Sequence, residues 1–322
     1  MIKEKNDTKS KWWTIRFIFI AAIIILICVF IWEAVVTSVY GKMSYEPIEA
    51  LADTDMTNDG VTNILLIGSD SRTIEDAGRS DAMILLSVSD KTHSIQMISL
   101  LRDMYVEIPG HEGNRLNAAY AFGGPELLLQ TVSQNLDIEV NRYVVVNFQA
   151  FANLVDAVGG VEIEVTNEEV SWINAYLNEY NLLRNMPIDT DYLDTSLSGN
   201  IILNGPQALA YSRNRYIGTD FGRTERQRKI LTAIIKKMPK AMFTNVKEIS
   251  EGLFPNLTTN LTKDDCKELS LDIAKLLLFR LEQSSIPAEG TYRDANIRGM
   301  AVLEVDFETN RKYLKNKIYG RK

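Results

Sequence analysis

The 322-residue sequence predicts a layered α/β/α domain with a central mixed sheet, preceded by one N-terminal transmembrane helix. Three observations predict this fold. A long apolar run near the N-terminus has about the length of a membrane span. Short apolar runs with strand character follow it. These runs alternate with helix-forming segments, which is typical of helices layered on a sheet.

The apolar run extends without a polar residue from Phe17 to Trp32 and continues beyond Glu33. A membrane-spanning helix needs about 20 mostly apolar residues, so residues 17–39 are predicted to form an uncleaved anchor. A cleaved signal peptide is the alternative. Its apolar core is usually about 7–15 residues long and precedes a site of small residues, and no convincing site of this kind follows here.

Charge predicts the orientation of this anchor. Residues 1–16 contain five basic and two acidic residues, so this tail carries +3 and the rest of the chain −10 of the formal net charge of −7. The positive-inside rule places the tail in the cytoplasm and the larger part outside. So acidic an ectodomain argues against nucleic-acid binding. We therefore predict a single-pass protein of the cell membrane whose larger C-terminal part is extracellular.

The segments beyond the anchor divide the ectodomain into three parts. Residues 40–60 are polar and acidic and are predicted to be an extracellular stem. A folded core follows over residues 61–240, with a C-terminal part over 241–322. The predicted strands of the core are 61–67, 82–88, 94–100, 143–146 and 161–165, and its helices are 125–136, 148–157, 206–212 and 220–238. The pattern of residues 167–200 predicts neither state. Residues 263–283 are expected to form a helix whose core residues are Leu271, Ile273, Leu276, Leu277 and Leu278.

Arginine is strongly favoured over lysine in one part of this acidic chain. Between Lys42 and Lys229 there are eleven arginines and one lysine, Lys91. A guanidinium group can hold two oxygens at once, whereas an ammonium acts as a point charge. The bias therefore predicts a site that orients phosphate or carboxylate oxygens, with a solvated ion-pair surface as the alternative. Five of the arginines are close in sequence: Arg213, Arg215, Arg223, Arg226 and Arg228.

Two carboxylates are placed where predicted strands end. Asp70 follows the strand 61–67, and Asp81 precedes the strand 82–88. Carboxylates from neighbouring strand ends can share a hard cation, and Mg²⁺ commonly keeps waters and substrate phosphates as its other ligands. Turn-forming aspartates are the ordinary alternative. A third charged segment, which contains Arg102 and Asp103, follows the strand 94–100.

Together these segments resemble the LytR–CpsA–Psr family of cell-wall glycopolymer transferases. One difference is Leu101, where the family commonly has proline. The matching order extends from about Val61 to Met238, which is more specific than any one motif. The matching segments are 64–72, 79–81, 101–105, 108–110, 116–124, 154–160, 203–209, 210–215 and 220–228.

This resemblance implies a function in assembly of the Gram-positive cell wall. The family transfers a glycopolymer from a polyprenyl-pyrophosphate carrier to a muramic acid hydroxyl of peptidoglycan, assisted by Mg²⁺ or Mn²⁺. By resemblance, Asp70 and Asp81 hold the metal, and together with Arg102 and Arg223 they are the expected catalytic residues. The expected pyrophosphate-binding residues are Arg79, Arg102, Arg213, Arg215, Arg223 and Gln227.

The physical chemistry agrees with this expectation. Negative charge develops on a pyrophosphate leaving group, and preorganised arginines and a metal stabilise it. On the helix predicted after Asp220, Gln227, Leu231 and Ile234 follow Arg223 on one face and predict a polar site that leads into an apolar slot. A core helix is the alternative.

Other functions remain open at this point. Water could replace peptidoglycan as the acceptor, which would make the protein a hydrolase of polyprenyl-pyrophosphate glycans. A non-catalytic lipid-glycan binding protein is a further alternative, and Asp70, Asp81 and Asp103 are all candidates for the general base. A membrane-bound transcriptional regulator is excluded because a tail of sixteen residues is too short for a DNA-binding fold.

Overall fold

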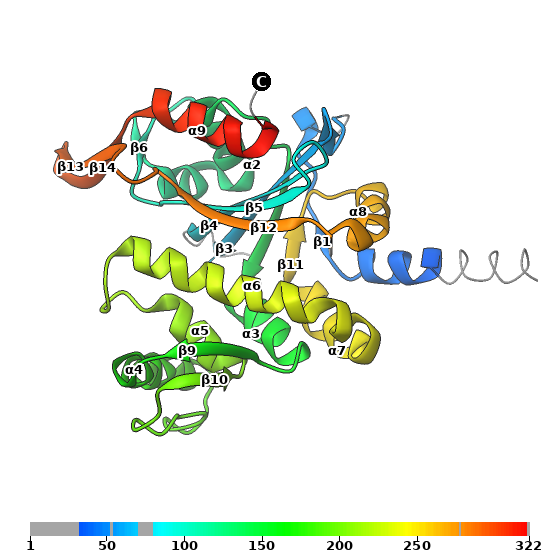
Figure 1. Ribbon diagram of the computed structural model, residues 1–322, viewed down its shortest axis with the longest axis vertical. Helices are drawn as coiled ribbons and strands as arrows, with labels where there is room; N and C mark the ends of the chain where they lie inside the picture. Colours follow the sequence, from blue (N-terminus) through cyan, green and yellow to red (C-terminus); the bar gives the residue numbers. More distant parts are fainter. Residues whose placement is uncertain (1–31, 52–53, 70–79, 277, 321–322) are drawn as a thin grey trace, which may run out of the picture.

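The computed structural model describes residues 32–51, 54–69, 80–276 and 278–320. The predicted mixed α/β fold with a central mixed sheet is confirmed (Figure 1). In the view of Figure 1, helices α2 (Leu116–Leu136) and α9 (Phe307–Tyr319) lie above the sheet, and α6 (Asp220–Thr244) lies below it. The core of the domain is therefore built on both faces of one sheet.

The central sheet has eight strands. Its order is β1-β11-β8-β3-β4-β5-β12, and β2 pairs with β3. Strands β3 and β8 are parallel, as are β5 and β12, whereas β4 is antiparallel to both of its neighbours. The sheet strands are β1 (Ser44–Tyr45), β2 (Thr57–Asn58), β3 (Val61–Ser69), β4 (Ser80–Ser89), β5 (Ser94–Leu100), β8 (Arg142–Asn147), β11 (Leu257–Thr259) and β12 (Arg280–Ile286).

The predicted boundaries of several elements are close to those observed. Strand β5 and helix α3 (Phe148–Ala157) have the predicted ends. The side chain of Asn147 caps α3 by accepting a hydrogen bond from the backbone N–H of Ala150. The helix predicted at 125–136 is the second half of α2, which bends at Gly123 and Gly124. Gly124 has φ of 61°, a conformation that glycine adopts without strain.

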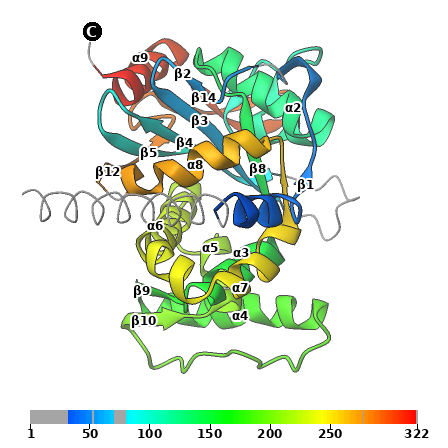
Figure 2. The same ribbon diagram turned by 90° about the vertical axis from the view of Figure 1, so that its right-hand side faces the viewer.

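One predicted strand belongs to another sheet. Residues 161–165 form β9 (Val161–Val165), which pairs with β10 (Gly199–Leu203) and not with the central sheet. The unassigned segment before β10 contains α4 (Asn167–Leu183), which begins with a capping box of Thr166 and Glu169. Helix α5 (Gly205–Arg213) completes this lobe, which lies at the bottom of Figure 2.

The helix predicted over residues 263–283 is confirmed at its start and wrong at its end. Helix α8 (Lys263–Leu276) ends earlier, and Arg280–Ile286 forms the edge strand β12. Leu271 and Leu278 are 66% and 85% exposed and not part of the core. A short apolar run does not distinguish a helix from a strand, and here parallel pairing with β5 decides the outcome.

The remaining elements are short or belong to the C-terminal part. A hairpin of β13 and β14 precedes α9, whose residues Leu314 and Ile318 are buried in the core beneath it. These elements are η1 (Glu49–Leu51), β6 (Tyr105–Val106), β7 (Asn114–Arg115), α7 (Val246–Gly252), η2 (Phe254–Asn256), β13 (Tyr292–Ile297) and β14 (Met300–Val305).

Most of the predicted anchor, residues 17–31, lies outside the described residues, as does the tail 1–16. Within the described part of the chain, no helix has both the length and the apolar composition of a membrane span. Residues 32–40 are helical and lie beside α8 (Figure 2). The indole N–H of Trp32 donates to Ser270 Oγ at 2.9 Å, and Glu33 pairs with Lys267 at 3.0 Å.

Candidate functional site

Four predicted site residues converge at one edge of the central sheet. Asp81 is the second residue of β4, and Arg102 is in the turn after β5. Arg215 is in the loop between α5 and α6, and Arg223 is in the first turn of α6. The antiparallel pairing of β4 and β5 brings the start of one strand beside the end of the other. Four separate segments thus form one arginine cluster.

Asp81 joins two of these arginines. Its Oδ1 atom is 2.8 Å from Arg102 Nη1 and 3.2 Å from Arg215 Nη2. Charge-assisted hydrogen bonds of this kind are among the stronger polar contacts in proteins. The carboxylate therefore fixes the relative position of two guanidinium groups that sequence alone leaves 113 positions apart.

Arg102 also approaches two further carboxylates. Its Nε atom is 3.6 Å from Asp103 Oδ2, and its Nη2 atom is 3.8 Å from Asp220 Oδ1. Asp220 also pairs with Arg223, with 3.2 Å between Oδ1 and Nη1. On the other side, Arg115 Nε lies 3.5 Å from Asp103 Oδ1. Alternating arginines and aspartates therefore form a continuous network.

The cluster contains buried polar atoms without a hydrogen-bond partner among the described residues. Arg223 is only 3% exposed, and its Nε and Nη1 atoms make no hydrogen bond, although Nη1 pairs electrostatically with Asp220. The Oε1 atom of Gln227, one turn further along α6, also lacks a partner. Buried polar groups are normally satisfied. Unsatisfied guanidinium N–H groups at this position are suited to an oxyanion ligand.

Burial and neighbouring charges shift the pKa values in this cluster. Burial and a hydrogen bond to Asp220 raise the pKa of Asp103. Burial also raises the pKa of Asp220, but the hydrogen bond to Asp103 and the nearby arginines outweigh it and lower that pKa overall. Burial and the like charge of Arg102 lower the pKa of Arg223. The two carboxyl groups are therefore inequivalent, with the pKa of Asp103 raised and that of Asp220 lowered.

This inequivalence predicts how stability depends on pH in the Asp103→Asn variant. A raised folded-state pKa contributes stability that is present at low pH and is lost as pH rises through that value. The asparagine side chain does not ionise, so the variant escapes this loss. We expect the melting temperature of Asp103→Asn minus that of the wild type to increase from about pH 4 to about pH 7.

Asp306→Asn is the control with the opposite sign. Hydrogen bonds from the Thr309 hydroxyl and backbone N–H lower the pKa of Asp306, so its contribution is lost as pH falls. The corresponding difference for Asp306→Asn should therefore decrease as pH rises to about pH 5 and then stay constant up to about pH 7. A difference for Asp103→Asn that does not change with pH would contradict the raised pKa of Asp103.

The other arginines of the 213–228 segment have separate roles in the fold. The guanidinium carbon of Arg213 lies 4.6 Å from the ring centre of Phe148 and 5.6 Å from that of Tyr176. Arg226 is buried and pairs with Glu169 at 3.6 Å. Arg228 donates to Ser99 Oγ on β5 at 2.7 Å. The sequence-level cluster of five thus separates into two residues of the network and three that pack around it.

Two predicted site residues, Asp70 and Arg79, lie outside the described residues. Their neighbours Ser69 and Ser80 are paired at the same sheet edge as the cluster. Within the described residues, no group of three or more acidic, histidine or cysteine side chains is placed to hold a metal ion. Asp81 nevertheless fits the chemistry of Mg²⁺, which often uses one or two carboxylates together with phosphate oxygens. The metal site therefore stays a prediction.

Apolar side chains of β3 and β4 lie on the face of the sheet that is turned toward α6. Ser99 of β5 faces α6, and Ile84 of β4, its cross-strand partner, lies on the same face of the sheet. This face also carries Leu86, two residues further along β4, and Leu66 of β3, which pairs with Ile84. Leu66 and Leu86 are only half-buried, although they lie on central strands. By contrast, Ile234 of the predicted slot is 2% exposed and belongs to the core beneath α6. Leu231 is half-buried, so the slot along this helix stays a prediction.

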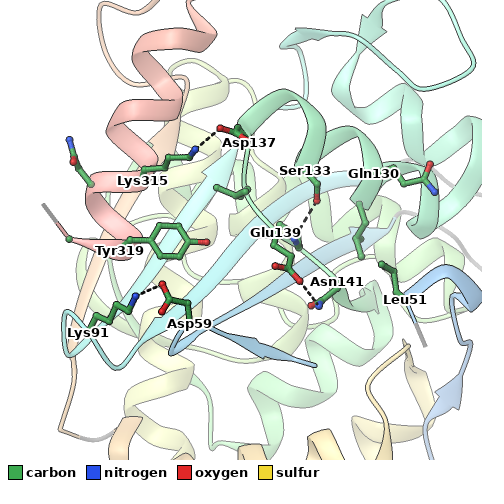
Figure 3. Close-up of a pocket in the computed structure, with 15 residues that line it drawn as sticks. Leu51, Asp59, Lys91, Gln130, Ser133, Asp137, Glu139, Asn141, Lys315 and Tyr319 are labelled. Atoms are coloured by element: carbon green, nitrogen blue, oxygen red, sulfur yellow. Dashed lines mark hydrogen bonds and ion pairs between the residues drawn. The ribbon is translucent and has the colours of Figure 1, made fainter. Parts of the chain in front are cut away.

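One well-defined cavity is separate from the arginine cluster. It has a volume of about 950 Å³ and is lined by residues near the opposite end of β3, with the ion pairs Lys91–Asp59 and Lys315–Asp137 at its rim (Figure 3). The side chain of Tyr319 lies between these pairs. Among the described residues that line it there are two lysines and no arginine, and both lysines are engaged in these ion pairs.

Comparison with known proteins identifies the family. The LytR_cpsA_psr family model matches residues 32–317. The chain belongs to this family. A teichoic acid transferase of Enterococcus faecalis, named polyisoprenyl-teichoic acid–peptidoglycan teichoic acid transferase TagU, is 32% identical over 85% of this chain and 86% of its own length. The TagU protein of Bacillus mycoides is 34% identical over 71% of this chain and 69% of its own.

Solved structures of LytR–CpsA–Psr proteins have the same fold. A structure described as TagT bound to LI-WTA has a TM-score of 0.64 and 27% identity, and covers 83% of this chain and 95% of that chain. TagT with bound octaprenyl pyrophosphate lipid has a TM-score of 0.61 and 26% identity, and covers 83% and 95%. The chain is thus an enzyme of a family whose named relatives are transferases.

The sequence did not identify every member of the network. Neither Asp220 nor Arg115 was among the residues that the sequence predicted for the site. Asp220 is three residues before Arg223 on α6, a spacing that places both on one helix face. That spacing was a usable signal for Asp220. Arg115 reaches Asp103 from β7, and no sequence spacing indicates this contact.

Proposed function

We propose that this protein transfers a glycopolymer from a polyprenyl-pyrophosphate carrier to a hydroxyl group of peptidoglycan. One observation carries this proposal: Arg102, Arg215 and Arg223 meet around Asp81 and Asp220, and buried N–H groups of Arg223 have no hydrogen-bond partner in the network. Such an arrangement suits the oxygens of a pyrophosphate. The names of the TagU relatives and the lipid bound to TagT support the same donor and acceptor classes.

The arginines would act on the charge of the leaving group. In a phosphotransfer reaction, the acceptor oxygen bonds to the phosphorus that carries the glycan, and the bridging P–O bond breaks. Polyprenyl phosphate leaves with the electron pair of that bond. Guanidinium groups that are already in position stabilise this charge without reorganisation. Two of them, on Arg102 and Arg215, are held by Asp81.

The acceptor hydroxyl must lose a proton during this step. Among the three described carboxylates of the network, Asp81 contacts two guanidinium groups at hydrogen-bond distance. The pKa of Asp103 is raised by burial and by Asp220, so its carboxylate binds a proton more tightly than an ordinary one. We therefore assign Asp103 as the proton acceptor. This assignment selects one of the three candidates for the general base that the sequence left open, which were Asp70, Asp81 and Asp103.

A prenyl chain has a place beside the cluster. The half-buried Leu66 and Leu86 lie on the face of the sheet that is turned toward α6. Alternate residues of β4 from Ala82 to Val88 lie on the same face. This apolar strip is roughly 20 Å long at about 3.3 Å per residue. It begins next to Asp81 on the same strand. A lipid held there would have its pyrophosphate at the arginine cluster.

A divalent cation and a membrane anchor complete the proposal. Mg²⁺ or Mn²⁺ held by Asp70 and Asp81 would supply further charge stabilisation to the phosphates. An anchor over residues 17–39 would keep the extracellular domain near its lipid donor. A reporter fused to the C-terminus should be active outside the cell, and activity only in the cytoplasm would contradict this topology.

The decisive assay combines purified full-length protein, Mg²⁺ and a synthetic polyprenyl-pyrophosphate glycan, with and without peptidoglycan oligomers. Glycan joined to the oligomers is the expected product. Release of free glycan with or without oligomers would indicate the hydrolase. Binding of the donor without turnover would indicate a non-catalytic lipid-glycan binding protein.

A further inference from the structure

An exposed aromatic surface lies next to the arginine cluster. The rings of Trp172 on α4 and Tyr216 in the α5–α6 loop are stacked, with 4.0 Å between their centres and 8° between their planes. Tyr176 lies 6.4 Å from Tyr216. Tyr216 remains 67% exposed, although one face of its ring is covered by Trp172. We call Trp172, Tyr176 and Tyr216 the aromatic platform.

Hydrogen bonds to Asn214 and Arg226 hold the loop that carries Tyr216 in place. Asn214 Oδ1 accepts hydrogen bonds from the backbone N–H groups of Tyr216 at 2.9 Å and Ile217 at 3.3 Å. Arg226 donates to the carbonyl oxygens of Asn214 and Ile217, both at 2.8 Å, and it also pairs with Glu169 on α4. These contacts tie the loop to the helix that carries Trp172. The platform is therefore preorganised and not a freely rotating surface side chain.

The platform and the arginine cluster share one loop. Arg215, which pairs with Asp81, directly precedes Tyr216, so the two Cα atoms are about 3.8 Å apart. Arg213 lies over the ring of Tyr176. A molecule whose phosphate is held by Arg215 therefore has the aromatic platform within reach of the group attached to that phosphate.

We propose that the aromatic platform binds a sugar ring of the lipid-linked glycan, close to its pyrophosphate. This inference rests on the proposed function and adds a saccharide subsite to it. A pyranose presents C–H groups on one face, and these pack on the electron-rich face of an aromatic ring while the hydroxyl groups remain in water. The solvent-exposed position of Tyr216 suits such an amphipathic ring. A prenyl chain would instead need the apolar face of the central sheet that is turned toward α6.

The aromatic platform is expected to bind the donor glycan and not the acceptor saccharide, because the donor glycan is covalently bonded to the pyrophosphate. The glycan of the donor is bonded to the pyrophosphate that Arg215 would hold, and Tyr216 is the next residue along the chain. No such connection brings the acceptor to this loop. The acceptor saccharide is therefore treated as a competing outcome of the test.

The test measures binding of two lipids to full-length protein in detergent. One is a synthetic polyprenyl pyrophosphate that carries a disaccharide, and the other is the same lipid without sugar. Tyr216→Ala should weaken binding of the first about two- to tenfold and leave binding of the second unchanged. Tyr216→Phe should bind both as the wild type does because the aromatic face is retained. Tyr192→Ala removes another exposed tyrosine of the same lobe and should change neither affinity.

The outcomes separate this inference from the proposed function. If the wild type binds both lipids equally and Tyr216→Ala changes neither affinity, the platform has no role in donor binding, although the pyrophosphate site stands. Equal losses for both lipids would mean that the variant acts through Arg215. A change only in the KM for peptidoglycan oligomers would assign the platform to the acceptor. Failure of the wild type to bind either lipid would overturn both the platform and the proposed function.

Discussion

The Arg223→Lys variant is expected to transfer glycopolymer about 10²–10³-fold more slowly than the wild type, nearly as slowly as Arg223→Ala. Arg223 is 3% exposed, and Asp220 contacts only one of its terminal nitrogens. Lysine preserves the charge but has neither the planar shape nor the paired N–H groups that hold two oxygens. The transfer rate and the donor affinity of both variants should be measured across a salt series.

The controls separate loss of chemistry from loss of folding. Arg142 is also buried and pairs with Asp265 at 2.6 Å, in a part of the fold away from the cluster. Arg142→Lys should lower the melting temperature without lowering the transfer rate of the protein that remains folded. If Arg223→Lys keeps near-normal activity that declines smoothly with salt, the cluster acts only as an electrostatic surface, since exposed charges are screened within about 10 Å at 0.1 M.

The Asp81→Asn variant is expected to bind Mg²⁺ roughly 10–100-fold more weakly and to lose most of its transfer activity. The amide keeps the shape of the carboxylate but not its charge. It therefore weakens both the proposed metal site and the contacts to Arg102 and Arg215. Calorimetric titration with Mg²⁺, in the presence and absence of donor lipid, measures the first effect directly.

Asp156→Asn provides the matched control for this substitution. Asp156 accepts a hydrogen bond from the backbone N–H of Gly205 at 2.7 Å and does not contact the cluster. This variant should titrate with Mg²⁺ as the wild type does. If Asp81→Asn also shows an unchanged Mg²⁺ titration, Asp81 is not a metal ligand and functions only in positioning the two arginines.

Local sequence patterns were sufficient for many elements of the fold. The runs that became β5, β9 and α3 have clear periodicity or clear boundaries, and their observed ends match the predicted ones. The predictions failed where pairing between strands that are distant in the sequence decides the structure. The edge strand Arg280–Ile286 is specified by its neighbour β5, and the sequence contains no local signal of that pairing.

The arginine bias and the family resemblance also came from sequence, together with the choice of Asp81, Arg102, Arg215 and Arg223 as site candidates. The sequence was sufficient to select the arginines because their guanidinium groups bind paired oxygens in a way that no other side chain reproduces. Only the tertiary structure decided which of them meet. The antiparallel β4–β5 pairing and the first turn of α6 bring distant segments together and add Asp220 to the network. Contacts between remote segments depend on packing and strand register, and neither is encoded in the spacing of residues along the chain.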